Sequence, residues 1–102
     1  MGTLYYGSTL IPILIDDRTL IHLKTVTTSK LRRRESFFLS WSEPLSNGGG
    51  RVSIWICPTT ELIFVASNDP VDVEADLLER MSRSGMSRVG IVIEAEFARP
   101  LA

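Results

Sequence analysis

The segment Lys30–Trp41 carries the residues whose types and spacing come nearest to a recognisable chemistry. Four cations fall within its first five residues, and an alternating aromatic stretch follows them directly. Lysine and arginine side chains neutralise phosphates, and flat aromatic rings stack on nucleic-acid bases. The pattern therefore indicates a nucleic-acid contact site, to which a neighbouring hairpin would add one cation and one ring. The candidate residues are Lys30, Arg32, Arg33, Arg34, Arg51, Phe38 and Trp55.

The same segment has a structural interpretation, which the residues leave open. Cations at a helix C-terminus compensate the helix dipole without any ligand. Phe38 and Trp55 are equally suited to packing in a core or in a dimer interface. The sequence alone does not choose between these two interpretations.

No other constellation in the chain predicts catalysis. His22 is the only histidine, and no nucleophile or orienting partner is evident near it. One histidine and one cysteine, Cys57, do not make a metal-ligand set. The Asn47–Gly50 loop lacks the Lys-Ser/Thr of a phosphate loop. We therefore predict no catalytic residue, no metal and no cofactor.

The elements that must position these residues follow from hydrophobic periodicity and turn chemistry. The predicted order is ββαβββαβ, which indicates a single α+β domain over residues 1–102 with a largely antiparallel sheet of about five to six strands and two helices. The third to fifth strands are expected to form a meander. The expected strands are 3–6, 9–15, 36–41, 51–57, 62–66 and 88–94, and the expected helices are 17–34 and about 70–84.

The strands place apolar side chains on both faces of the predicted sheet. One face is large enough to receive both helices. The other face also carries apolar residues, although a sheet face exposed to water should be polar. Such a patch usually marks an interface, so a homodimeric or partner-binding domain is the alternative function. The second-face residues are Phe38, Trp55, Ile63, Val65 and Val92.

Composition and charge exclude several classes of protein. The chain is 44% hydrophobic and 23% charged, which is typical of a globular domain. Residues 1–51 carry a net charge of +3 and residues 52–102 a net charge of −4, so a polyanion would have to bind at a local patch. No apolar run is long enough to span a bilayer, and the N-terminus shows no signal peptide. We expect a cytoplasmic protein without a membrane partner, in which Cys57 is a buried, inert thiol.

Most of the first sixty residues resemble a family of small actinobacterial proteins that are labelled ATP-dependent DNA ligase or ligase-like. The resemblance lies in Met1–Gly7, Ile15–Arg18, His22-Leu23, Lys30–Arg33, Glu35–Phe37, Ser40-Trp41, Arg51–Trp55 and Pro58. A ligase of this kind needs a lysine nucleophile in a Lys-x-Asp-Gly context, and neither Lys24 nor Lys30 has it. The resemblance thus implies a non-catalytic, DNA-associated or ligase-accessory module, which is the leading hypothesis.

Overall fold

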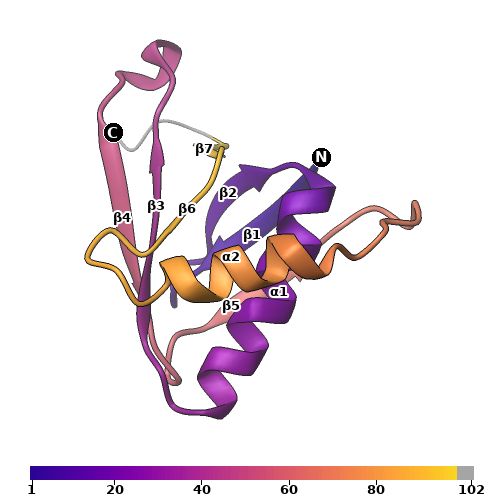
Figure 1. The fold of residues 1–102 in the computed structure, drawn as a ribbon. Coiled ribbons are helices and arrows are strands. Elements are labelled where there is room, and N and C mark those ends of the chain that lie inside the picture. The colour runs from indigo at the N-terminus through magenta and orange to yellow at the C-terminus, as the bar shows by residue number, and fades with distance from the viewer. Residues whose placement is uncertain (99–102) are drawn as a thin grey trace.

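The computed structural model describes residues 1–98 and shows an α+β domain, as predicted (Figure 1). Two helices and seven strands are present in this part of the chain, with a short 3₁₀ helix, η1, at the tip of the β3–β4 hairpin. The elements are β1 Gly2–Tyr6, β2 Ile11–Ile15, α1 Asp17–Arg32, β3 Phe37–Ser42, η1 Leu45–Asn47, β4 Arg51–Ile56, β5 Leu62–Val65, α2 Ala75–Ser84, β6 Ile91–Val92 and β7 Glu96–Phe97.

The strands divide between two sheets. The first sheet has the order β5-β1-β2-β7, and each neighbouring pair in it is antiparallel. The second has the order β4-β3-β6, with β3 and β4 antiparallel and β3 and β6 parallel. Figure 1 shows the β3–β4 hairpin extending beyond the rest of the molecule, with η1 at its end.

The expected meander is wrong, because β5 pairs with β1 and not with β4. A hydrogen bond from Gly7 N to the carbonyl oxygen of Glu61 holds the start of β5 against the end of β1. Tyr6 Oη donates to the carbonyl oxygen of Trp55 and so connects β1 to β4. Alternation in a sequence fixes which face of a strand is buried but does not identify its neighbour. The alternation in the sequence could therefore not predict which strand pairs with β5.

Helix α1 begins as predicted and ends two residues earlier than expected. Asp16 caps it, since its side chain accepts a hydrogen bond from Thr19 N. The β-branched run inside the helix is tolerated because Val26 and Thr27 are buried against the domain. The helix stops at Arg32, and Arg34 adopts a left-handed conformation with φ of 58° that turns the chain towards β3.

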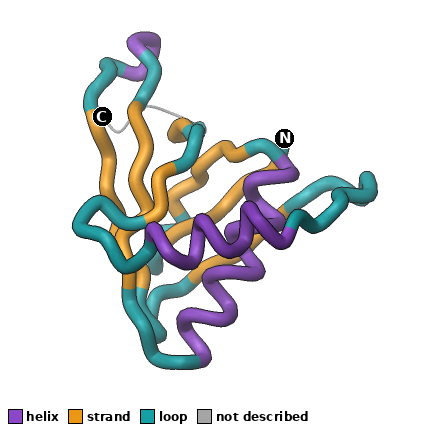
Figure 2. Tube along the Cα trace, viewed as in Figure 1, coloured by secondary structure: helices purple, strands orange, loops and turns teal. Residues whose placement is uncertain are grey.

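Helix α2 begins at Ala75 and not near residue 70, so its predicted start is wrong. The preceding segment is held against α1, because Glu74 N donates a hydrogen bond to His22 Nε2 at 2.9 Å and the Glu74 carboxylate pairs with Arg18. These contacts compete with helix formation at residues 70–74. Figures 1 and 2 show α2 lying across α1 after a long loop that extends away from the sheets.

The hydrophobic core lies between the helices and the inner faces of the two sheets. Trp41 and Phe97 stack edge to face across the two sheets, with ring centroids 5.4 Å apart. The buried carboxylate of Glu43 accepts hydrogen bonds from Trp41 Nε1, Phe97 N and Asn47 Nδ2. This network fastens the end of β3 to β7, and so joins the sheets. The other large core residues include Leu4, Ile13, Leu23, Phe37, Leu39 and Ile56.

Candidate functional site

Lys30, the first cation of the predicted patch, is not available to a ligand. Its side chain is buried between the helices, where its end lies against Gly85 after the last turn of α2. Its Nζ lies 3.6 Å from the carboxylate of Glu35. A cation in this position compensates the dipole at the C-terminus of α2. The structural interpretation of the patch therefore holds for Lys30.

Arg33 is also neutralised within the molecule. Its Nε lies 2.5 Å from Glu35 Oε2, and its guanidinium donates a second hydrogen bond to Ser29 Oγ at 2.9 Å. The hydrogen bond from Arg33 holds the pKa of Glu35 below its usual range, so the carboxylate stays charged. Arg32 and Arg34 are exposed, and neither forms an ion pair within residues 1–98.

The two predicted rings lie together on the outer face of the β3–β4 hairpin. Phe38 and Trp55 are opposite each other in register and stack edge to face with centroids 4.9 Å apart. Arg51 shares this face of β4 but lies four residues from Trp55, which is about 13 Å along a strand. The Arg32–Arg34 turn precedes the other end of the hairpin. The structure thus brings the rings together and separates Arg51 from the remaining cations.

The residues predicted for the second apolar face are exposed, but they belong to two different sheets and do not form one sheet face. The side chains that the sequence placed there are between 38% and 63% exposed. Val92 lies beside Ser40 in the parallel pair of β3 and β6, and so on the Phe38 side of the ring pair, with β3 between it and Trp55. The exposed residues are Phe38, Trp55 and Val92 on the second sheet and Ile63 and Val65 on the first.

A groove of about 830 Å³ between α1 and β5 is lined by Arg32 and Arg33 of the predicted patch and by Lys24, which the sequence interpretation did not include. Lys24, Thr28 and Arg32 follow one another at intervals of four along α1, so they form a row on one helix face. This spacing was the signal in the sequence that could have identified Lys24. The lining residues are Leu20, Ile21, Lys24, Thr25, Thr28, Ser29, Arg32, Arg33, Phe64 and Ala66, and they include no carboxylate.

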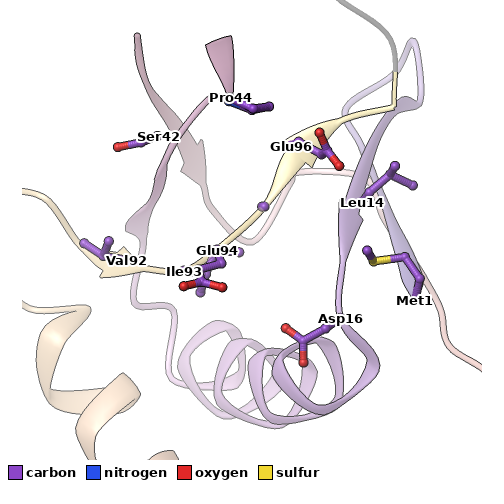
Figure 3. A pocket seen from close by; sticks show the side chains of 10 residues that line it. Met1, Leu14, Asp16, Ser42, Pro44, Val92, Ile93, Glu94 and Glu96 are labelled. Atoms are coloured by element: carbon purple, nitrogen blue, oxygen red, sulfur yellow. The ribbon is translucent and has the colours of Figure 1, made fainter. Parts of the chain in front are cut away.

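A second cleft, of about 480 Å³, is acidic (Figure 3). Figure 3 shows Asp16, Glu94 and Glu96 distributed around it, with Leu14 and Pro44 among the apolar lining. Within residues 1–98 no group of three or more histidine, cysteine or acidic residues is arranged to hold a metal ion. The cleft therefore carries negative charge without a coordination site.

His22 and Cys57 have roles that differ from each other. His22 is fully buried and packs between α1 and the segment before α2, with Nδ1 2.6 Å from the carbonyl oxygen of Arg18.

Cys57 is half-buried, and hydrogen bonds from the Thr59 and Thr60 hydroxyls and the Thr59 backbone lower the pKa of its thiol to about 7. The expectation of a buried, inert thiol is therefore wrong, because the β4–β5 turn exposes Cys57 and supplies donors.

Fold and surfaces together define a small α+β domain. Residues 1–96 match the model of a family described as a domain of unknown function (DUF7882), and the chain belongs to this family. No curated protein and no solved structure matches the chain. The helices of the described region include none that is long and apolar enough to cross a membrane.

Proposed function

We propose that the protein is a non-catalytic, cytoplasmic interaction domain that self-associates through the outer face of β3, β4 and β6. The observation that carries this proposal is the exposed Phe38–Trp55 pair with Val92 beside it. Large aromatic side chains that remain exposed together are typical of interface centres. Both helices pack on the inner side of the fold. The segment before β6 reaches the outer face at Ser40, whose Oγ donates to the carbonyl oxygen of Val89 at 2.7 Å, and the two rings remain exposed.

The same face is self-complementary under a twofold axis. Arg51 and Trp55 lie on one face of β4, on either side of Ser53. A second copy placed antiparallel, with the axis near Ser53, brings Arg51 of each copy over the Trp55 ring of the other. A guanidinium over an indole face is a favourable cation–π contact. This arrangement also satisfies the requirement that a twofold interface use the same patch on both partners.

Light scattering across a concentration series tests the proposal. We expect a concentration-dependent dimer, and Trp55→Glu should make the protein monomeric because it places an unpaired charge at the interface centre. Arg51→Ala removes both symmetry-related cation–π contacts and should weaken association roughly 5- to 900-fold, the range for two contacts of about 0.5–2 kcal/mol each. Val73→Glu is the matched control, since Val73 is an equally exposed apolar residue that lies in the loop before α2. A wild-type protein that is monomeric at all concentrations contradicts the proposal.

A second proposal is a nucleic-acid-associated function, such as a ligase accessory, as the resemblance implies. Lys24, Arg32 and Arg34 support it, since all three are exposed and none is ion-paired within residues 1–98. Three phosphate contacts with duplex DNA predict a log–log salt slope of about −3. An anisotropy titration at two salt concentrations measures this slope, and Arg32→Ala/Arg34→Ala should reduce it. Binding that ignores salt, or no binding at low salt, contradicts this second proposal.

A further inference from the structure

The β5 strand has an open edge, which follows from how it pairs with β1. Gly7 N donates to the carbonyl oxygen of Glu61 at 2.9 Å, so these two residues form a hydrogen-bonded pair. Such pairs alternate along an antiparallel ladder, and the next ones are Tyr5 with Ile63 and Thr3 with Val65. The N–H and C=O groups of Leu62 and Phe64 therefore point away from β1. No other strand of the described chain pairs with β5.

This open edge borders the groove against α1 that was described above. Phe64 and Ala66 line the groove from the β5 side, and Leu20 and Ile21 add apolar surface from the helix. The opposite wall carries the exposed cations Lys24 and Arg32. An edge strand beside a helix, with an apolar floor between them, has the components of a strand-addition site for peptides.

The spacing of the cations matches that of side chains along an extended peptide. Lys24 and Arg32 are eight residues apart on α1, which is about 12 Å along a helix. Side chains four residues apart on one face of a β-strand are separated by about 13 Å. Two carboxylates at this separation in a peptide would each face one cation. The groove lining contains no carboxylate that would oppose them.

We propose that this groove binds an extended acidic peptide segment of another protein, which adds as a strand to the edge of β5. The peptide backbone pairs with the N–H and C=O groups of Leu62 and Phe64. Its carboxylates at positions i and i+4 face Lys24 and Arg32. A peptide is favoured over a nucleic acid because it satisfies both donors and acceptors of the edge, whereas phosphate oxygens satisfy donors alone.

A labelled peptide of sequence Thr-Glu-Thr-Val-Thr-Glu-Thr-Val is the probe, with a lysine-for-glutamate version as its matched control. We expect anisotropy to show salt-sensitive binding of the acidic peptide alone. Amide hydrogen exchange by NMR should show new protection at Leu62 and Phe64, which simple charge attraction would not produce. Lys24→Ala/Arg32→Ala should weaken binding roughly threefold to tenfold, while Arg80→Ala, on α2 and outside the groove, should leave it unchanged.

Three results overturn the inference. They are no binding of the acidic peptide, equal binding of the lysine version, and binding without protection at Leu62 and Phe64. A single-stranded oligonucleotide is titrated in parallel, and if it displaces the peptide or binds in its place the groove belongs to the nucleic-acid proposal. The dimer face around Trp55 is a separate surface, so light scattering on the same samples decides self-association independently.

Discussion

At the residue scale, the Cys57 thiol shows how hydrogen bonds within a turn can lower the pKa of a side chain. The Thr59 and Thr60 hydroxyl oxygens each lie 3.3 Å from Sγ, and Thr60 Oγ1 also accepts from Cys57 N. Donors aimed at sulfur stabilise the thiolate, which is why the pKa of Cys57 falls from 9.0 to about 7. Half-exposed and partly ionised at neutral pH, the thiol should react readily with electrophiles.

We predict that the rate of Cys57 alkylation by iodoacetamide rises with pH around a midpoint near 7. Thr59→Val removes the largest stabilising hydrogen bond, so the midpoint should move upwards and the rate at pH 7 should fall several-fold. Thr28→Val, on α1 and away from the turn, is the control and should leave the profile unchanged. A midpoint near 9 in the wild-type protein would show that the threonine donors do not stabilise the thiolate.

At the element scale, the contact between β6 and β3 depends on Gly90. Its φ is +73°, and a Cβ at this position would overlap the backbone carbonyl of Phe38. Gly90→Ala should therefore cost about 2–4 kcal/mol of the free energy of unfolding, measured by urea denaturation. Gly50 offers a matched control, since its φ is +90° and no atom lies within 4 Å of the added Cβ. Gly50→Ala should cost only the conformational strain, about 1–2 kcal/mol, and equal losses would contradict the steric argument.

The elements also show how far sequence reasoning extends. Periodicity predicted α1 and the β3–β4 hairpin well, because one face of each is buried and the sequence records that face. It failed at the start of α2, where contacts of Glu74 with His22 and Arg18 override a good capping signal. Burial of Lys30 depends on a tertiary contact with Gly85, whereas Arg33 is neutralised locally by Glu35, two residues along the chain. The exposed Phe38–Trp55 pair was predictable, since alternation places both on the face opposite the core.

At the scale of the whole molecule, the first half of the chain is basic and the second half acidic. Few of these charged side chains are buried. Among residues 1–98, three carboxylates have lowered pKa values in the folded protein. A hydrogen bond from Ser67 lowers the pKa of Asp17, and one from Arg33 lowers that of Glu35. Burial of Glu43 raises its pKa, but the donors Trp41, Asn47 and Phe97 outweigh burial and leave it below 4.5.

These lowered pKa values predict the acid stability of the domain. The unfolded chain binds more protons than the folded one once the pH approaches 4.5 for glutamate and 3.8 for aspartate. The free energy of unfolding in urea should therefore fall only slightly between pH 7 and about 5.5, as the Cys57 thiolate is protonated, and fall further as the pH drops through the folded pKa values of the carboxylates. Glu43→Gln should lose about 1–3 kcal/mol at pH 7, because Asn47 Nδ2 or Trp41 Nε1 then faces another donor.

The difference between the Glu43→Gln variant and the wild type should close as the pH falls through the lowered folded pKa of Glu43, since the wild-type carboxylate is then protonated and has lost its advantage over an amide. Glu61→Gln is the control, because its exposed side chain forms no hydrogen bond within residues 1–98 and should leave the curve unchanged. A gap between wild type and Glu43→Gln that stays constant into acid would mean that Glu43 acts through shape alone. A closing gap would show that the charge of this one carboxylate, which joins β3 to β7, holds the two sheets together.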